Sequence, residues 1–245
     1  MMITGIFYKP EGQREYRLPL DTFNLIIGKS GTGKTLLLKS LFAYICHSRT
    51  GVPLSEIKDQ MKFSYDGEVD IQWDTSFEGS VFFIPSCDAY LYDDWGRADL
   101  PLHIRKTVGV YRSWQKRGFD FEGVLKDKLG ISASHGGLLK TKVFIGVREE
   151  IKEGDILLVD LPEAGLDATV WKWWIDEIVS LVSRGIQVFL TTHDFFVYTY
   201  VRSHITRGNI IYFTESDIQT YDINTGIPED AVILRVPLEV LESAM

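Results

Sequence analysis

One short stretch of the chain has glycine, lysine and hydroxyl side chains at a spacing suited to holding phosphate. It fits the pattern G-x-x-x-x-G-K-[ST], in which glycines allow backbone N–H groups to converge on an anion. A helix that begins at the end of the loop adds the positive end of its dipole. The loop consists of Gly28, Lys29, Ser30, Gly31, Thr32, Gly33, Lys34 and Thr35.

The residues on either side of this loop are the ones such a site needs. Residues 23–27 form an apolar run with β-branched side chains, which is typical of a buried strand. Apolar residues then recur at helical spacing from Leu36 to Ile45. In this context Lys34 is expected to reach the β and γ phosphates, and the Thr35 hydroxyl to hold Mg²⁺. The sequence therefore predicts a nucleoside triphosphate site.

A carboxylate and a histidine follow two further apolar runs. Residues 156–159 are apolar and end in Asp160, and a strand of this form carries the aspartate that orients Mg²⁺ through its water shell. Residues 186–190 predict the next buried strand, and His193 follows it. Ligands of parallel sheets bind at the carboxyl ends of the strands. Asp160 and His193 are therefore expected beside the phosphate loop.

The rest of the pattern predicts short strands alternating with helices. An aromatic residue of the first strands, Tyr8 or Tyr16, is a candidate to stack on the base, although a buried structural role is the simpler interpretation. The tryptophans of the helix after Asp167 are predicted to be core residues. The expected strands are 3–8, 14–20, a hairpin over 62–74, 81–84, 209–213 and a hairpin over 217–225; the expected helices start at Ser55 and cover 103–117, 121–129, 138–151 and 168–183.

Composition limits the class of protein. The chain has 245 residues, 45% of them hydrophobic, which is enough for a single α/β domain over residues 1–245. Its two cysteines, Cys46 and Cys87, form no CxxC pair, so we expect a reducing, cytoplasmic location. We see no signal peptide, and no apolar run approaches the ~20 residues of a membrane span. The expectation is therefore a protein with no membrane partner.

Charge is spread unevenly along the chain. The formal net charge is -8, yet residues 97–148 contain eleven Lys and Arg against four Asp and Glu, a local balance of +7. Tyr111, Trp114 and Phe119 lie among these cations and have rings of the kind that stack on bases. This basic region is either a solvated helical face or a contact surface for an acidic partner, including nucleic acid.

Another glycine-bearing turn precedes the helix predicted at 138–151. It contains Ser134, Gly136 and Gly137, and alone it is a weak signal. With the other motifs in this order, the chain resembles the ABC-type ATPase superfamily, and within it the soluble SMC/Rad50-like and overcoming-lysogenization-defect-like ATPases. The corresponding motifs are Walker A (28–35), the signature motif (134–137), the Walker B Asp160, the D-loop (164–167) ending in Asp167, and the switch histidine His193.

The resemblance implies a fold and a mechanism. The fold would be an α/β P-loop NTPase with a mixed sheet flanked by helices, a small N-terminal antiparallel sheet and a helical subregion at about 97–151. Two copies would stack head to tail, with ATP and Mg²⁺ between the Walker A loop of one and the signature residues of the other. A helix-terminus anion site at Ser134, Gly136 and Gly137 suits a γ-phosphate. Such an ATPase would act as a nucleotide-gated switch for a separate effector protein or for nucleic acid.

The chain departs from that family at three points. Leu161 stands where the catalytic glutamate follows Asp160, and leucine neither orients nor deprotonates water, so Glu163 is the candidate replacement. No glutamine follows the strand at 81–84, where Ser86 and Asp88 are the nearest polar groups to a Q-loop. Only about a hundred residues separate the Walker A and signature motifs, which is too few for long coiled-coil arms.

Two other interpretations remain open at this stage. Lys29 occupies the position of the second lysine in deviant Walker A proteins of the MinD/ParA type, where it reaches across a dimer. The chain otherwise has features that those proteins lack, namely D-x-P-E at 160–163 and T-T-H-D at 191–194. Leu161 also allows a nucleotide-gated binding module that hardly hydrolyses ATP.

Overall fold

This structure is a computed structural model that describes residues 2–9, 14–61, 68–73, 78–86, 101–131 and 138–228, together with 231 and 234. The strands are β1 (Ile3–Lys9), β2 (Tyr16–Pro19), β3 (Phe23–Gly28), β4 (Glu68–Trp73), β5 (Val81–Ile84), β6 (Ile156–Asp160), β7 (Gln187–Thr192), β8 (Asn209–Phe213) and β9 (Ile218–Asp222). The helices are α1 (Lys34–Thr50), α2 (Leu54–Gln60), α4 (Leu102–Lys116), α5 (Phe121–Leu129), α6 (Leu138–Glu150), α7 (Ala168–Ser183) and α8 (Phe195–His204).

The strands form two sheets. The large sheet has six strands in the order β5-β6-β7-β3-β8-β9, in which only β9 is antiparallel to its neighbour. The small sheet is antiparallel, in the order β2-β1-β4. Because β6, β7 and β3 are adjacent and parallel, their carboxyl ends lie at one edge of the large sheet. This is the P-loop NTPase fold with a mixed sheet that the sequence predicted.

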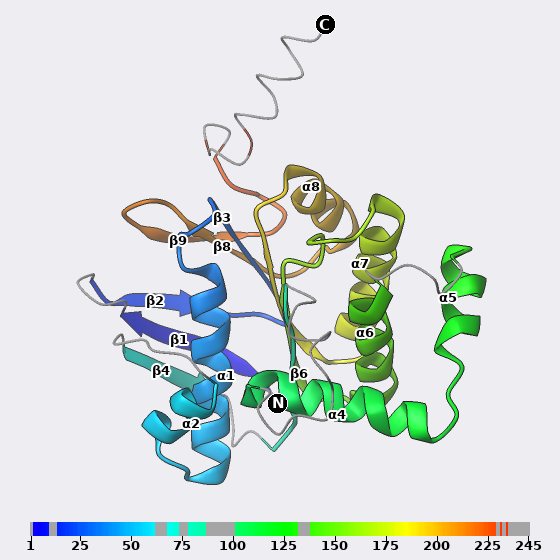
Figure 1. The fold of residues 1–245 in the computed structure, drawn as a ribbon. Helices are drawn as coiled ribbons and strands as arrows, with labels where there is room; N and C mark the ends of the chain where they lie inside the picture. The colour runs from blue at the N-terminus through cyan, green and yellow to red at the C-terminus, as the bar shows by residue number, and fades with distance from the viewer. Residues whose placement is uncertain are drawn as a thin grey trace, which may run out of the picture.

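Both faces of the large sheet are covered. In β3, Phe23, Leu25 and Ile27 belong to a core formed with α4, α5, α6, α7 and α8, whereas Ile26 belongs to a second core formed with α1 and the small sheet. Side chains of a strand alternate between its faces, so a continuous apolar run serves both cores. Figure 1 shows α1 and the small sheet on one side of the strands, and α6 and α7 on the other.

A buried glutamine joins the two sheets. The side chain of Gln187, at the start of β7, accepts a hydrogen bond from Ile3 N at 2.9 Å and donates to Ile3 O at 2.8 Å. It also donates to Asp21 O at 2.9 Å. Such contacts satisfy both ends of a buried amide and fix where the small sheet sits against the large one.

Most of the predicted elements are present, with some corrections. The hairpin predicted over 217–225 is wrong, because this segment supplies one strand, β9, whose partner is β8. Of the hairpin predicted over 62–74, residues 68–73 form β4 and pair with β1, while 62–67 and 74 lie outside the described residues. Tyr8 and Tyr16 are buried, so neither ring is exposed for stacking on a base. Within the described ranges, no helix combines the length and apolar content of a membrane span.

Substitution of Gly28, the first glycine of the phosphate loop, tests the close packing of β3 against β8. A Cβ on Gly28 would lie 2.4 Å from Phe213 O on the neighbouring strand β8, and the backbone has φ +148°. We expect Gly28→Ala to lower the free energy of unfolding by about 3 kcal/mol, through steric overlap and backbone strain. The measurement is urea denaturation.

Gly109 is the matched control for this substitution. It lies exposed in α4 with nothing within 4 Å of an added Cβ. Gly109→Ala should raise stability by about 0.5–1 kcal/mol, since alanine has the higher helix propensity. A Gly28→Ala protein as stable as the wild type would contradict the close approach of β3 and β8.

Candidate nucleotide site

The phosphate loop connects β3 to α1, as the sequence predicted. Gly33 is the N-cap of α1 with φ +100°, a backbone conformation that glycine adopts readily. The first turn of α1 has no acidic residue, and no side chain of the described residues caps its N-terminus. The N–H groups of this helix end are therefore left for another acceptor, and a phosphate fits them.

Lys34 lies buried across the loop. Its Nζ donates to Gly28 O at 2.8 Å and to Lys29 O at 2.5 Å. Burial lowers the pKa of Lys34, whereas the charges of Asp160 and Glu163 act to raise it. The ammonium thus lies among carbonyl oxygens and within electrostatic reach of two carboxylates. A triphosphate would offer it charged acceptors, which form stronger hydrogen bonds than neutral carbonyls do.

Thr35 and Asp160 meet at the predicted Mg²⁺ site. The Thr35 hydroxyl donates to the Asp160 carboxylate, at 2.9 Å from Oδ1 and 3.0 Å from Oδ2. Thr191 on β7 donates to the same Oδ1 at 2.7 Å. Mg²⁺ usually takes one or two protein oxygens together with substrate phosphates and water. A hydroxyl and a buried carboxylate beside a phosphate loop fit that requirement.

Glu163 points into the same region from the turn after β6. Its Oε1 accepts a hydrogen bond from the Thr192 hydroxyl at 2.7 Å, and Thr192 in turn accepts one from Asp194 N at 3.0 Å. Its Oε2 is buried and has no hydrogen-bond partner among the described residues. Burial raises the pKa of Glu163, although the Thr192 hydrogen bond and the charge of His193 act to lower it. A carboxylate with a raised pKa and a free oxygen is suited to take a proton from water.

Other predicted residues have different positions. His193 is exposed after β7 and lies close enough to affect the pKa of Glu163. Asp167 is the N-cap of α7, where its carboxylate accepts hydrogen bonds from Thr169 N and Val170 N. Ser134, Gly136 and Gly137, the predicted signature residues, lie outside the described residues.

Lys29 forms an ion pair within its own chain. Its Nζ is 2.5 Å from the Glu215 carboxylate, and both side chains are largely exposed. The pair holds this lysine at the β8–β9 turn, and Ser30 beside it is exposed. The Thr32 hydroxyl donates to Lys29 O at 2.9 Å. The geometry of this chain therefore gives no support to a lysine that reaches across a dimer.

Three residues of the site were missed in the sequence analysis. Thr191 and Thr192 hold Asp160 and Glu163, and their only signal was their place directly before His193. Lys140, counted with the basic region, is fully buried. Sequence patterns do not tell a buried lysine from a solvated one, because this depends on which distant segments surround it.

Leu161 is held in an unusual backbone conformation. It has φ +47°, the one positive value among the described non-glycine residues. Its N–H donates to the Thr191 hydroxyl at 3.0 Å. Left-handed backbone is costly for a residue with a Cβ, and such strain concentrates at functional sites. The turn that carries Glu163 therefore begins at a strained residue.

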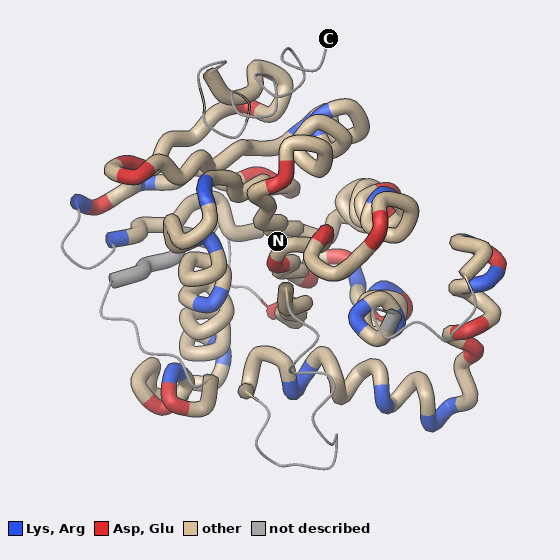
Figure 2. Tube along the Cα trace, turned by 45° about the horizontal axis from the view of Figure 1, so that its top comes forward, with Lys and Arg blue, Asp and Glu red and all other residues tan. Residues whose placement is uncertain are grey.

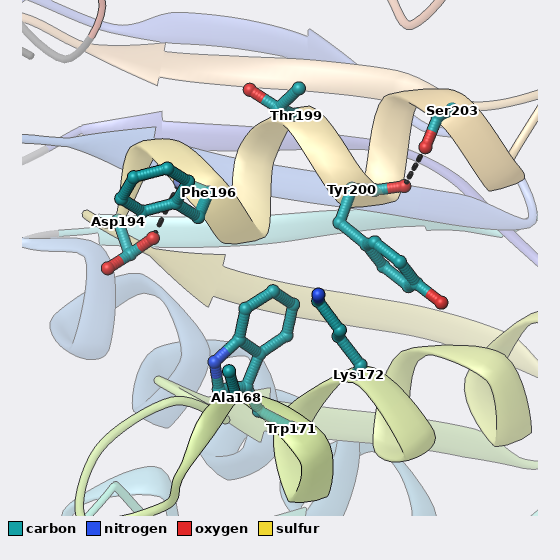
Figure 3. A pocket seen from close by; sticks show the side chains of 8 residues that line it. All are labelled: Ala168, Trp171, Lys172, Asp194, Phe196, Thr199, Tyr200 and Ser203. Carbon is teal, nitrogen blue, oxygen red and sulfur yellow. Dashed lines mark hydrogen bonds between the residues drawn. The ribbon is translucent and has the colours of Figure 1, made fainter. Parts of the chain in front are cut away.

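A separate hollow of about 500 Å³ lies between α7 and α8. Figure 3 shows Trp171 and Lys172 on α7 opposite Tyr200 on α8, with Phe196 near the start of α8. It includes none of the predicted phosphate or Mg²⁺ ligands. Trp171 and Trp174 are core residues, as predicted; Trp174 stacks on Phe144, and Trp171 also borders this hollow.

The charge of the basic region at 97–148 overstates how many of its side chains can contact an acidic partner. Figure 2 shows Lys and Arg positions spaced along α4. Lys140 is buried, however, Lys142 pairs with Glu122, and Arg148 pairs with Glu149 and Glu177. The aromatic residues pack on one another or in the core: Tyr111 against Phe121, and Trp114 against Phe119. Nucleic-acid binding therefore stays a prediction from sequence, with fewer free groups to support it.

Comparisons with known proteins support this fold. No protein-family model matches the chain. The ATP-binding protein MntA of the manganese transport system of Synechocystis sp. is 24% identical over 178 residues, which are 71% of this chain and 65% of that protein.

Two solved structures share the fold. One is an inward-facing ABC transporter assigned to the metal-chelate type, with a TM-score of 0.52 and 14% identity over 95% of this chain and 89% of that one. The other is cbiO1 from Clostridium perfringens, part of the ABC transporter complex cbiONQ, with a TM-score of 0.50 and 18% identity over 98% of this chain and 100% of that one. The chain therefore has the fold of an ABC-type ATPase nucleotide-binding domain.

These relatives correct one prediction. The expectation that the protein has no membrane partner is wrong, because its relatives are named as components of transport systems. A lack of apolar spans in this chain says nothing about a partner that is itself embedded in a membrane.

Loss of the Lys34 ammonium tests the site directly. We expect Lys34→Ala to weaken ATP binding by at least ~2 kcal/mol, the scale of a lost charged hydrogen bond. Isothermal calorimetry in Mg²⁺ measures this affinity. Lys152→Ala is the control, because Lys152 is exposed just before β6, at the opposite end of that strand from Asp160. Equal affinities for the wild type and Lys34→Ala would reject the loop as the phosphate site.

Proposed function

We propose that this protein binds Mg²⁺–ATP at the phosphate loop and hydrolyses it slowly. The observation that carries this proposal is the convergence of Lys34, Thr35, Asp160 and Glu163 at one edge of the sheet. Lys34 and Thr35 follow β3, whereas Asp160 and Glu163 lie at the end of β6, more than a hundred positions further along the chain. ATP hydrolysis by Glu163 is the function that best uses all four groups.

Each group has a distinct task in this mechanism. Lys34 exchanges its loop carbonyls for the β and γ phosphates, and the N-terminus of α1 holds their oxygens. Thr35 and Asp160 would hold Mg²⁺, which would supply charge neutralisation at the phosphate oxygens. Glu163 accepts the proton of the attacking water through its free Oε2, while Thr192 holds its other oxygen. His193, which is exposed after β7, would be the second group able to act near the γ-phosphate. The products are ADP and phosphate.

Leu161 makes this chemistry slow. In the family that the sequence resembles, the residue after the Walker B aspartate is the catalytic glutamate. Here that position is apolar, and the replacement carboxylate lies two residues further along a strained turn. A general base that is not aligned with the attacking water accelerates proton transfer less, because catalysis depends on precise orientation. We infer a long-lived ATP-bound state.

We also propose that ATP joins two copies head to tail. Ser134, Gly136 and Gly137 of one copy would contact the nucleotide of the other, beside Asp167. The motif order and the fold of the relatives support this arrangement. The dimer would be a nucleotide-gated switch that acts on a separate partner protein.

The partner follows from weaker evidence. The chain spans 65% of the length of the curated relative, an ATP-binding protein of a transport system. Since the structural relatives are also named as transporter components, a membrane permease is the first partner to test. Membership of the SMC/Rad50-like branch rests on the sequence motifs alone. The Lys29–Glu215 pair weighs against the MinD/ParA-type alternative.

Turnover of ATP distinguishes a slow enzyme from a binding module. We expect the wild type to turn over below ~1 s⁻¹, at the slow end of phosphoryl-transfer enzymes. Glu163→Gln should abolish this steady-state activity, because the amide accepts no proton, and leave only a residual reaction that single turnovers reveal over hours. Leu161→Glu should raise the rate by restoring a carboxylate directly after Asp160. Phosphate release under steady-state conditions measures all three.

The control is the stability of Glu163→Gln. Since burial raises the pKa of Glu163, its ionised form costs stability above that pKa, and the cost disappears as the pH falls through it. Glu163→Gln should therefore be no less stable than the wild type at neutral pH, so lost activity would not reflect unfolding. Brisk wild-type hydrolysis that Glu163→Gln leaves unchanged would place the catalytic group elsewhere.

Dimerisation has its own test. Light scattering should give twice the monomer mass when a non-hydrolysable ATP analogue and Mg²⁺ are present. Ser134→Arg should prevent this, because a bulky cation would occupy the place of the partner's γ-phosphate. Ser183→Arg, at the far end of α7 from Asp167, is the matched control. Nucleotide-dependent dimers that survive Ser134→Arg would contradict the role of the signature turn.

A further inference from the structure

Lys140 is a fully buried lysine on α6 that the mechanism above does not use. Its Nζ donates to Leu161 O at 2.8 Å and lies 3.4–3.5 Å from the carbonyl oxygens of Ser86, Pro162 and Ala164. It also lies 5.4 Å from the centre of the Trp174 ring, within the range of a cation–π contact. An ammonium therefore sits at the centre of a cage of backbone carbonyls.

Three of the four carbonyls belong to one turn, which connects β6 to α7 and carries Glu163. Within this turn Ala164 N donates to Leu161 O at 3.1 Å, and Leu166 N to Glu163 O at 3.0 Å. Lys140 thus reaches the carbonyls on both sides of Glu163. Several carbonyls of the turn therefore accept hydrogen bonds from one side chain, that of Lys140 on α6.

The strained residue of the turn is held at both of its backbone groups. Leu161 N donates to the Thr191 hydroxyl, and Leu161 O accepts from Lys140. A positive φ at leucine persists only where surrounding contacts over-determine it. Thr191 from β7 and Lys140 from α6 together supply this constraint.

An apolar side chain in the place of Lys140 would cost less free energy to bury. The surroundings include Trp174 and the apolar residues of α6, and a buried cation is costly to desolvate. A group retained against such a cost, within bonding distance of a catalytic turn, is a candidate for a functional role.

We propose that Lys140 is the positioning residue that fixes the Leu161–Pro162–Glu163–Ala164 turn, so that the Glu163 carboxylate faces the γ-phosphate. The inference rests on the proposed ATP hydrolysis by Glu163. Lys140 contacts carbonyl oxygens of the turn. It acts through the backbone of the turn, and its loss leaves the phosphate loop and its affinity for ATP in place.

The test is Lys140→Met, which keeps the length of the side chain and removes its charge and donors. We expect kcat for ATP to fall tenfold to a hundredfold, the range for residues that orient a catalytic group. The KM for ATP and the Kd for a non-hydrolysable analogue should change less than about threefold. Lys142→Met is the matched control, since Lys142 lies on the same helix and pairs with Glu122 near the surface. It should leave kcat unchanged.

A second measurement separates positioning from general stability. In single turnovers followed over hours, Lys140→Met should slow the residual reaction of Glu163→Gln by less than about twofold, because the group that it positions is already absent. A purely structural role would slow both backgrounds equally. Equal slowing, an unchanged kcat in the wild-type background, or a parallel loss of ATP affinity would overturn the proposal.

Two further outcomes need to be distinguished: a Lys140→Met protein that does not fold, and a wild type that does not hydrolyse ATP. Where Lys140→Met does not fold, Lys140→Gln retains N–H donors on a shorter, uncharged side chain and should show the same fall in kcat with unchanged KM; an unchanged kcat would overturn the proposal. A wild type that does not hydrolyse Mg²⁺–ATP overturns the proposed function. A wild type that hydrolyses it, but whose kcat Lys140→Met leaves unchanged, overturns the role of Lys140 alone.

Discussion

The site depends on the hydrogen bonds that converge on the Asp160 carboxylate. Thr35 reaches this carboxylate from the first turn of α1, and Thr191 reaches it from β7. Because β6, β7 and β3 are parallel neighbours, the end of β7 and the helix that follows β3 are both brought within bonding distance of one carboxylate. The phosphate loop is thereby held in register with the turn that carries Glu163. A fold with another strand order would separate the bound nucleotide from Glu163, the proposed general base.

Polar and strained groups are concentrated at this edge of the sheet. Lys34, Asp160 and Lys140 are buried, and Leu161 has left-handed backbone. One oxygen of Glu163 has no hydrogen-bond partner within the described part of the chain. Each feature costs stability, and the two apolar cores on either side of the large sheet offset this cost. The remainder of the large sheet has the continuous apolar strands expected of a parallel sheet covered on both faces. Function and stability are thus divided between the edge and the body of one sheet.

The catalytic turn is the feature that sets this chain apart from the family it resembles. With leucine directly after Asp160, the carboxylate is displaced by two residues and must be aimed by the backbone of the turn. Thr192 orients its side chain, while Thr191 and Lys140 hold Leu161. We propose that an ATPase built this way holds its nucleotide and acts on it slowly, which would suit a switch better than a continuous motor.

The sequence by itself determined the features that depend on local pattern. The phosphate loop, the strand ending in Asp160 and the helices at 121–129 and 168–183 follow from spacing that a short window contains, because helix and strand periods are local. The tertiary structure alone decided which distant groups meet. The burial of Lys140 and Tyr8, the pairing of β9 with β8, and the bonds of Thr191 and Thr192 depend on strand order and helix packing. No local pattern encodes these contacts, since each partner lies far away in the chain and looks like an ordinary surface or core residue in its own segment.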